Sequence, residues 1–274
     1  YAGGCNLGAK NALGKYLFFL NNDTVVTRDC FNLLINTIEK NNKISSVQPK
    51  IKNFFNKNLF DYAGGCGGYI DYLCYPFVKG RIFNSIEEDI GQYDKESKIF
   101  WASGTAFLTR KDVFNKVEGF DESLFAHMEE IDYHWKCLLL GYDIFSQPNA
   151  LIYHKGGQTL PYGSSEKIFL NHRNSMILFL TNNFNLSYSS IMKRIILEKL
   201  TVLFYIMKLN LNGGYAVTKA NIWLLLNIKY LRKRKKQFNE LYGSDIIISS
   251  DLMKKFSVIK KYYLHQKKKF SNLN

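Results

Sequence analysis

Three polar residues, Asn21, Asn22 and Asp23, directly follow the apolar run YLFFL at residues 16–20. A short run of this kind predicts a buried strand, and open parallel sheets bind ligands beyond the carboxyl ends of their strands. Asn21 and Asp23 would then share one side of the extended chain, where their oxygens suit Mg²⁺ or Mn²⁺ and an attached diphosphate. The same residues also favour a simple turn, so both interpretations stand.

A second group of acids lies in the segment FDESLFAHMEEIDYHWK (120–136), where Glu129, Glu130 and Asp132 crowd the start of a predicted helix. The helix dipole stabilises acids at such a position, which explains them in general terms. A carboxylate held beside apolar walls can instead act as a general base near neutral pH, because burial raises its pKa. The segment therefore offers a catalytic base as an alternative to a purely structural role.

His154 stands at the end of a predicted strand over residues 142–154, which Pro148 interrupts. A single His at a strand end is usually a hydrogen-bonded structural residue. If neighbouring strand ends carry an Asn and Asp metal site, the same His becomes a candidate ligand of that metal.

The elements that must position these residues alternate between helices and strands. Apolar spacing predicts helices at 6–14, 30–41, 111–117 and 129–141, and strands at 16–20, 44–51, 99–110 and 142–154. This alternation predicts an α/β domain with a largely parallel sheet. The Gly-rich segment 63–83 is expected to be a long ordered loop, and Gly104, inside the strand at 99–110, indicates a close approach to the backbone.

Charge divides the chain near residue 160. Residues 1–159 carry 17 Lys+Arg and 18 Asp+Glu, whereas residues 160–274 carry 20 and 5. We therefore expect an α/β domain over 1–160 and a basic, mainly helical region over 161–274. The basic region suits an anionic membrane surface, with a solvated helical face and nucleic-acid binding as alternatives.

No apolar run reaches the roughly 18 residues that a membrane span requires. Five scattered cysteines without a CxxC pair predict reduced thiols in a reducing compartment, such as the cytoplasm.

In combination, three segments resemble family 2 glycosyltransferases of the GT-A fold, and they are most similar to the bacterial rhamnosyltransferase-like branch. The segments are GGCNLGAKNALGKYLFFLNNDTVV, ASGTAFLTRKDVFNKVEGFDESLFAHMEEIDYHWK and GYDIFSQPNALIYHKGGQTL, and the resemblance covers about residues 1–180. It implies inverting transfer of a sugar from a nucleotide-diphosphate donor, for which dTDP-rhamnose is the branch's commonest label. The implied acceptor is a saccharide or a lipid-linked saccharide of cell-surface polysaccharide assembly.

The resemblance also implies a metal site. Asn21-Asn22-Asp23 matches the family's DXD-type motif, with Asn in place of the first Asp. Asp23 would bind a divalent cation with help from Asn21, and Asn22 would lie against the donor. His154 matches a His that completes the metal site in some relatives.

The implied catalytic base lies in the acidic pair Glu129-Glu130, where family members usually carry Glu-Asp. We expect Glu130 to be the base, with Glu129 as the alternative. Gly104, Asp121 of the GFDE loop and Asp132 are expected to lie near the donor sugar and the acceptor.

Family members carry a first strand and helix ahead of the segment that begins at Tyr1, so we expect the domain to lack its first strand or strands. The expected partners are a nucleotide sugar, the acceptor and the inner face of the cytoplasmic membrane. One alternative is a truncated, non-catalytic domain that binds membrane or protein partners. A nucleic-acid-binding protein would explain the charge but not the acids, so no nucleic-acid partner is expected.

Overall fold

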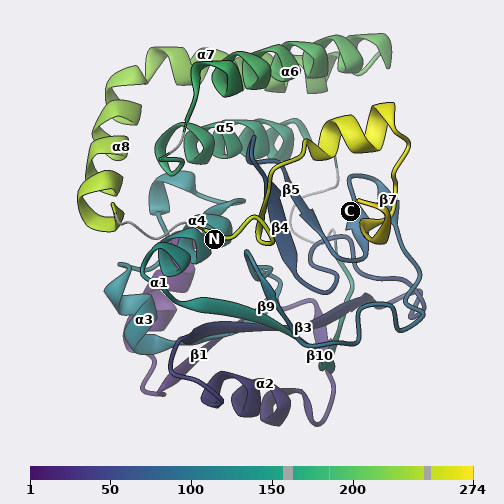
Figure 1. The fold of residues 1–274 in the computed structure, drawn as a ribbon, viewed down its shortest axis with the longest axis vertical. Coiled ribbons are helices and arrows are strands. Elements are labelled where there is room, and N and C mark those ends of the chain that lie inside the picture. The colour runs from purple at the N-terminus through teal and green to yellow at the C-terminus, as the bar shows by residue number, and fades with distance from the viewer. Residues whose placement is uncertain (157–162, 185, 244–247, 274) are drawn as a thin grey trace.

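The computed structural model describes residues 1–156, 163–184, 186–243 and 248–273 (Figure 1). A mixed α/β part precedes a mainly helical part, which confirms the expected fold class. The predicted domain boundary at residue 160 lies outside the described residues. Within the described part of the chain, no helix is long and apolar enough to cross a membrane.

The main sheet has one parallel pair and four antiparallel pairs among its described strands. Its order is β1 (Tyr16–Leu20), β9 (Ala106–Arg110), β3 (Ile44–Asn53), β10 (Asp143–His154) and β2 (Thr24–Val26), and β8 (Ser97–Ile99) also pairs with β10. Only β3 and β10 pair in parallel. This corrects the expectation of a largely parallel sheet.

The helix–strand alternation did predict that β1, β3 and β10 run in one direction. The strand between β1 and β3 is β9, which runs the opposite way. The chain reaches β9 after a long excursion rather than a helical crossover, so nothing imposes a parallel orientation on it. The carboxyl ends of β1, β3 and β10 and the start of β9 therefore meet at one edge of the sheet.

One face of this sheet is covered by α2 (Cys30–Glu39). Its buried residues Cys30, Leu34 and Ile38 recur every four positions and pack with Val47 and Ile152 of the strands. Figure 1 shows α2 on one side of the sheet and the other helices on the opposite side. The helices of the α/β part on that side are α1 (Ala2–Asn11), α3 (Lys111–Lys116), the 3₁₀ turn η1 (Glu122–Leu124) and α4 (Glu129–Leu139).

A second, smaller sheet takes three strands from the Gly-rich segment 63–83, for which the sequence predicted a loop, one from just after it and one from residues 253–254. It contains β4 (Gly68–Asp71), β5 (Pro76–Val78), β6 (Arg81–Ile82), β7 (Ser85–Ile86) and β11 (Met253–Lys254). The glycines permit close packing here instead of breaking the strands. A Cβ on Gly68 would lie 2.1 Å from the Trp101 ring, and one on Gly80 would lie 2.3 Å from the Phe60 ring.

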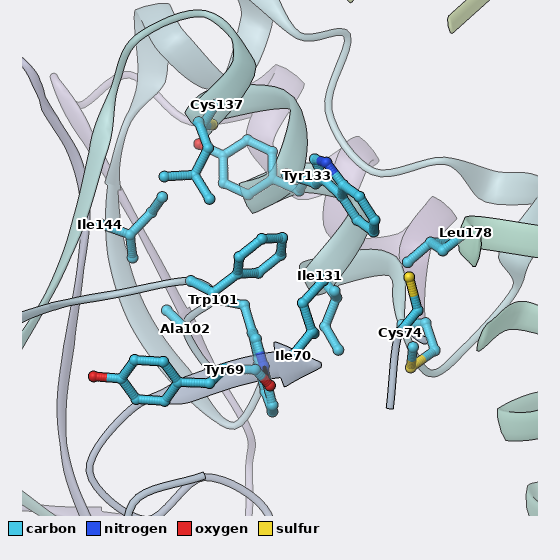
Figure 2. Packing of buried hydrophobic residues seen from close by; sticks show 14 of the residues in the cluster. Tyr69, Ile70, Cys74, Trp101, Ala102, Ile131, Tyr133, Cys137, Ile144 and Leu178 are labelled. Carbon is cyan, nitrogen blue, oxygen red and sulfur yellow. Dashed lines mark hydrogen bonds between the residues drawn. The ribbon is translucent and has the colours of Figure 1, made fainter. Parts of the chain in front are cut away.

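The helical part continues the hydrophobic core of the α/β part. Its elements are α5 (Ser165–Thr181), α6 (Tyr188–Met207), α7 (Leu211–Leu226) and α8 (Ile228–Tyr242), followed by a π turn η2 (Lys260–Leu264) and a 3₁₀ turn η3 (Phe270–Asn272). In Figure 2, Tyr69, Trp101 and Ile131 of the α/β part and Leu178 of α5 belong to the same buried cluster. The two parts are thus packed through one core.

Candidate active site

The polar residues after β1 form a turn that leads to the end of β10. The Asn21 backbone N–H donates to the Thr105 carbonyl at 2.9 Å, and the hydroxyl of Thr24 donates to the Asn21 carbonyl at 2.7 Å. Asn22 is exposed on the turn. The carbonyl of Asp23 accepts the N–H of Lys155 at 3.0 Å. The turn interpretation is therefore correct, and this turn brings Asp23 beside His154.

His154 lies between two carboxylates. Its Nε2 is 3.1 Å from Asp23 Oδ1, and its Nδ1 is 2.9 Å from Oδ1 of the buried Asp61. Burial by itself lowers the pKa of His154, but the hydrogen bond and charge of Asp61, together with those of Asp23, outweigh burial and raise it. The raised pKa favours a protonated ring that donates to both carboxylates.

When Nε2 of His154 is deprotonated, the same pair would fit two neighbouring ligands of a divalent cation. Adjacent ligands of an octahedral ion with bonds of about 2.1 Å lie about 3.0 Å apart, close to the separation between Asp23 Oδ1 and His154 Nε2. Asp61 supplies the carboxylate contact that commonly orients a metal-binding imidazole through its other nitrogen.

The protein contributes few ligands to this candidate site. Among the residues that the structure describes, no three or more His, Cys, Asp and Glu side chains are grouped so as to hold a metal ion. Two protein ligands agree with Mg²⁺ sites that are completed by water and phosphate oxygens. The role of Asn21 as a third ligand remains a prediction.

The acidic pair begins α4 after a backbone segment in unusual conformations. Phe125, His127 and Met128 have φ angles of 65°, 67° and 75°, a left-handed region that residues other than Gly seldom adopt. The Asn174 side chain of α5 holds this segment: its Nδ2 lies 2.8, 2.9 and 2.7 Å from the carbonyl oxygens of residues 124, 126 and 127. The helical part thus supports the segment that presents the acids.

Burial raises the pKa values of both acids. The pKa of the half-buried Glu130 is raised to about 7 by desolvation. Burial, with a further contribution from the charge of Glu130, raises the pKa of Glu129 well above its usual range. One buried carboxylate oxygen of each residue has no hydrogen-bond partner among the described residues. Glu130 therefore has the properties of a proton acceptor that works near neutral pH.

Gly104 brings the sheet edge against Glu130. A Cβ at Gly104 would lie 3.8 Å from Cδ of Glu130 and 3.3 Å from Oη of Tyr1, whose hydroxyl donates to the Gly104 carbonyl at 2.8 Å. The expected close approach at Gly104 is present, although Gly104 lies in a turn before β9 and not inside a strand. Because Asn21 bonds to Thr105, the turn at 104–105 adjoins both the acidic pair and the start of the Asp23 turn.

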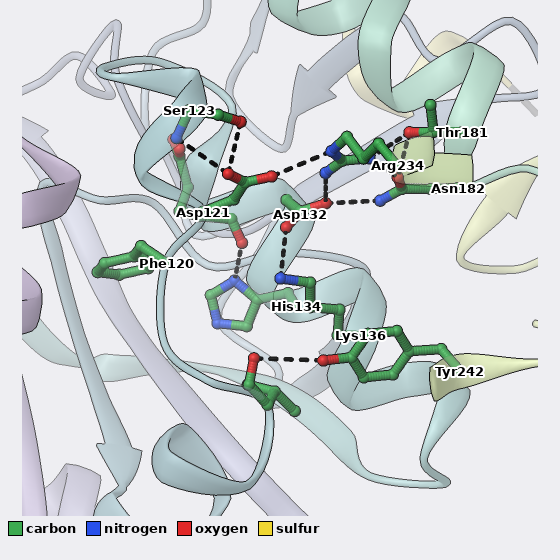
Figure 3. Close-up of polar contacts among 12 residues, drawn as sticks. Phe120, Asp121, Ser123, Asp132, His134, Lys136, Thr181, Asn182, Arg234 and Tyr242 are labelled. Carbon is green, nitrogen blue, oxygen red and sulfur yellow. Dashed lines mark hydrogen bonds and ion pairs between the residues drawn. The ribbon is translucent and has the colours of Figure 1, made fainter. Parts of the chain in front are cut away.

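Asp121 and Asp132 both contact Arg234 of α8, as Figure 3 shows. Arg234 lies 3.0 Å from Asp121 Oδ2 and 2.7 Å from Asp132 Oδ1, and Lys136 lies 2.8 Å from Oδ2 of Asp132. Burial raises the pKa of Asp132, but Lys136 and Arg234 hold it well below its usual range.

These contacts give Asp121 and Asp132 partners within the protein, and their expected places near the donor sugar and the acceptor remain predictions. Asp132 is fully buried, and it follows Glu130 by two positions, which places the two side chains on different faces of α4. Asp121 caps η1 by accepting the backbone N–H of Ser123 at 2.9 Å. Both acids therefore have structural roles.

Sequence reasoning missed two residues that build the site, Asp61 and Asn174. Asp61 is 93 positions from His154, and no spacing rule connects the two residues. Asn174 lies in the polar run NHRNS (171–175) of α5, and no motif distinguishes it from its neighbours.

Residues 1–118 match the family model described as Glycosyl transferase family 2. The match confirms the family resemblance for this part of the chain, which includes the Asp23 turn, Asp61 and Gly104. The rhamnosyltransferase-like branch and the absence of a first strand remain predictions. No curated protein matches the chain in sequence.

Two solved structures align with part of this chain. One is GalNAc-T7 with UDP, GalNAc and Mn²⁺, with a TM-score of 0.48 and 17% identity over 64% of this chain and 33% of that chain. The other is the mannosyltransferase PcManGT from Pyrobaculum calidifontis in complex with GDP-Man and Mn²⁺, with a TM-score of 0.42 and 12% identity over 88% of this chain and 64% of that chain. This chain therefore aligns with a third of the first structure and less than two thirds of the second.

Proposed function

We propose that this protein is a metal-dependent glycosyltransferase that transfers a sugar from a nucleotide-diphosphate donor with inversion. The observation that carries the proposal is the arrangement around the turn at 104–105. An acid with a pKa of about 7, Glu130, adjoins this turn, and the Asp23 turn, with its metal-compatible Asp23–His154 pair, is hydrogen-bonded to it. The family match over residues 1–118 supports this proposal.

In this mechanism Asp23 and His154 would hold the divalent cation, Mg²⁺ or Mn²⁺, and Asp61 would orient the imidazole. When bound, the cation supplies positive charge that stabilises the leaving diphosphate. Asn21 and Asn22 remain proposed contacts of the donor.

Glu130 would accept the proton of the acceptor hydroxyl as that oxygen attacks the anomeric carbon from the face opposite the diphosphate. The sugar is transferred in one step, so its configuration inverts and no covalent bond to the enzyme forms. Glu129 would stay protonated while Glu130 is ionised, because two neighbouring buried carboxylates do not readily carry two charges.

We propose a saccharide or lipid-linked saccharide of cell-surface polysaccharide assembly as the acceptor, at the inner face of the cytoplasmic membrane. The resemblance in sequence and the excess of basic residues after position 160 support this placement. The resemblance to the rhamnosyltransferase-like branch makes dTDP-rhamnose the first donor to test.

The test is transfer and donor hydrolysis across a panel of nucleotide sugars, each with Mn²⁺, Mg²⁺ or EDTA. We expect turnover of one donor that EDTA abolishes and a divalent cation restores. Asp23→Ala and Glu130→Gln should each abolish transfer, and Glu130→Gln should still bind the donor in calorimetry. Glu240→Gln, which changes an exposed acid on α8, is the matched control and should keep full activity.

Full transfer by Glu130→Gln would overturn its assignment as the base and move that role to Glu129. Turnover that EDTA leaves unchanged would overturn the metal site. Failure of the folded protein to bind or turn over any nucleotide sugar would contradict the proposed reaction and favour the non-catalytic alternative.

A further inference from the structure

Helix α6 differs from an ordinary surface helix because it buries charged side chains and exposes many apolar ones. Its only buried residues are the charged Arg194 and Glu198, each 1% exposed. Arg194 bonds to the carbonyl of Leu73 at 2.6 Å and stacks its guanidinium 3.6 Å from the centre of the Tyr75 ring. Glu198 pairs with Arg194 at 3.1 Å. The helix therefore packs on the protein through this ion pair and through the half-buried side chains of Ile191, Leu197, Val202 and Tyr205.

The apolar face of α6 is turned outward. Met192, Ile196, Leu200, Leu203 and Met207 are exposed, and their spacing of three or four positions places them along one stripe of the helix. Leu203 is 54% exposed and Met207 is 83% exposed. Apolar side chains that are exposed together in this way often mark a surface that binds a partner or a membrane.

The stripe continues onto α7. Figure 1 shows α6 and α7 side by side along one edge of the molecule, beyond α5. The connecting turn exposes Leu209, and one side of α7 exposes Leu211, Tyr215, Ile222, Leu225 and Leu226. We call the stripes of the two helices and their turn the α6–α7 face.

The charges around this face are of one sign. Four lysines are exposed here: Lys193 and Lys199 of α6, Lys208 directly after α6, and Lys219 of α7. Within α6 and α7, both of which the structure describes in full, the only carboxylate belongs to the buried Glu198. A second copy of this chain would bring lysines against lysines, whereas an anionic lipid surface neutralises the lysines and buries the apolar side chains.

We propose that the α6–α7 face is the surface by which this protein lies on an anionic lipid bilayer, with both helices in the plane of the interface. The apolar stripe enters the boundary between headgroups and acyl chains, and the flanking lysines contact lipid phosphates. The inference specifies which face meets the membrane, and it does not depend on the transfer reaction.

The test is sedimentation of the full chain with vesicles of phosphatidylcholine that contain phosphatidylglycerol, compared with vesicles of phosphatidylcholine alone. We expect binding to the anionic vesicles that weakens as salt is raised. The double substitution Leu203→Glu and Met207→Glu should weaken binding at least about tenfold. Each change removes an apolar side chain that the bilayer would bury, and it places a negative charge against the anionic lipid. Both side chains are exposed, so the fold should be unaffected.

Leu13→Glu with Ile90→Glu is the matched control, because these residues are 100% and 78% exposed and lie outside the face. It should bind the anionic vesicles as the unchanged protein does. Replacement of Lys199 and Lys208 by Gln should remove most of the salt dependence.

Three results would overturn the inference. The first is unchanged binding by the Leu203→Glu and Met207→Glu variant. The second is equal, salt-independent binding to neutral and anionic vesicles. The third is a dimer in light scattering that this variant dissociates, which would show that a second copy covers the face.

Discussion

Burial of the Glu130 carboxylate opposes its ionisation and so raises its pKa. The raised pKa makes the ionised carboxylate a better proton acceptor. A solvated Glu is ionised at neutral pH but is a weak base, whereas an acid with a pKa of about 7 is both available and basic enough. The raised pKa also has a thermodynamic consequence. The stability that it contributes is complete below the unfolded pKa of about 4.3 and is lost as pH rises through about 7.

The rate of transfer should therefore depend on pH with an acidic limb near 7. Below this pH Glu130 holds its proton and cannot accept another, so kcat should fall about tenfold per pH unit and should level off above pH 7. The measurement is kcat from pH 5 to 9 at saturating donor, acceptor and metal. A limb below pH 5 would mean that the base is an ordinary solvated acid.

Residue types and their order identified candidate residues but did not predict their contacts. Asn21 to Asp23, Glu129, Glu130 and His154 could be recognised because each follows a strand or begins a helix. The pairing of His154 with Asp61 depends on how distant loops pack. The pairing of Asp132 with Arg234 was not predicted, because a cluster in sequence is divided between two faces of a helix.

At the scale of elements, the strained segment before α4 depends on a helix from the other part of the chain. Asn174 of α5 contacts three carbonyl oxygens in residues 124–127, and three residues between 125 and 128 adopt left-handed conformations. Such conformations persist only where surrounding contacts hold them. Asn174 is therefore a positioning residue for Glu129 and Glu130.

Asn174→Ala should lower kcat at least about tenfold and leave the affinity for the donor nearly unchanged. The substitution releases the segment that orients Glu130, whereas Asp23 and His154 lie on other elements. The measurement is kcat together with donor affinity, and the acidic limb of the pH profile should move because Glu130 becomes more solvated.

Ser175→Ala is the control for general destabilisation, because Ser175 is buried on the same helix but donates to Cys74 instead of the segment before α4. It should keep kcat and its pH profile. Equal losses of kcat in both variants, with the same pH limb, would show that Asn174 acts only through stability.

The helices α2, α3 and α4 and the strands β1, β3 and β10 were predicted within about two residues, since their apolar periodicities are clear. The helices after residue 160 were predicted only as a helical region, β2 and β8 were not predicted, and only the second half of the strand expected at 99–110 is present, as β9. The second sheet was missed because its glycines predict a loop when close packing against Trp101 and Phe60 is unknown. The position of β9 was missed because sheet order depends on long-range pairing that local patterns do not encode.

At the scale of the whole molecule, Arg234 fastens the helical part to the α/β part. It is 8% exposed and pairs with Asp121 and with the fully buried Asp132. Removing one member of a buried ion-pair cluster leaves the remaining charges without compensation, which is more damaging than the net value of the pair.

Arg234→Ala should lower the free energy of unfolding by about 3–5 kcal/mol. Unfolding should remain a single transition, because both parts share one core. The measurement is urea denaturation followed by tryptophan fluorescence and far-UV circular dichroism.

Arg232→Ala removes an exposed Arg from the same helix and should change stability by less than about 0.5 kcal/mol. Two separate transitions in the unchanged protein, or equal effects of the two substitutions, would contradict the role of Arg234 as a fastening residue.

The position of β9 between β1 and β3 also sets a requirement on the order of folding. Among the described residues, β1 has β9 as its only partner strand, with Tyr16 opposite Arg110. During synthesis, β1 and β3 emerge long before Arg110. Neither strand can complete its pairing with β9 until the chain has closed a loop of many tens of residues. Closure at such a sequence separation slows folding and leaves strand edges open to other chains in the meantime. Because β3 also pairs with β10, the nascent chain is thus most exposed to aggregation between the synthesis of β3 and that of β10.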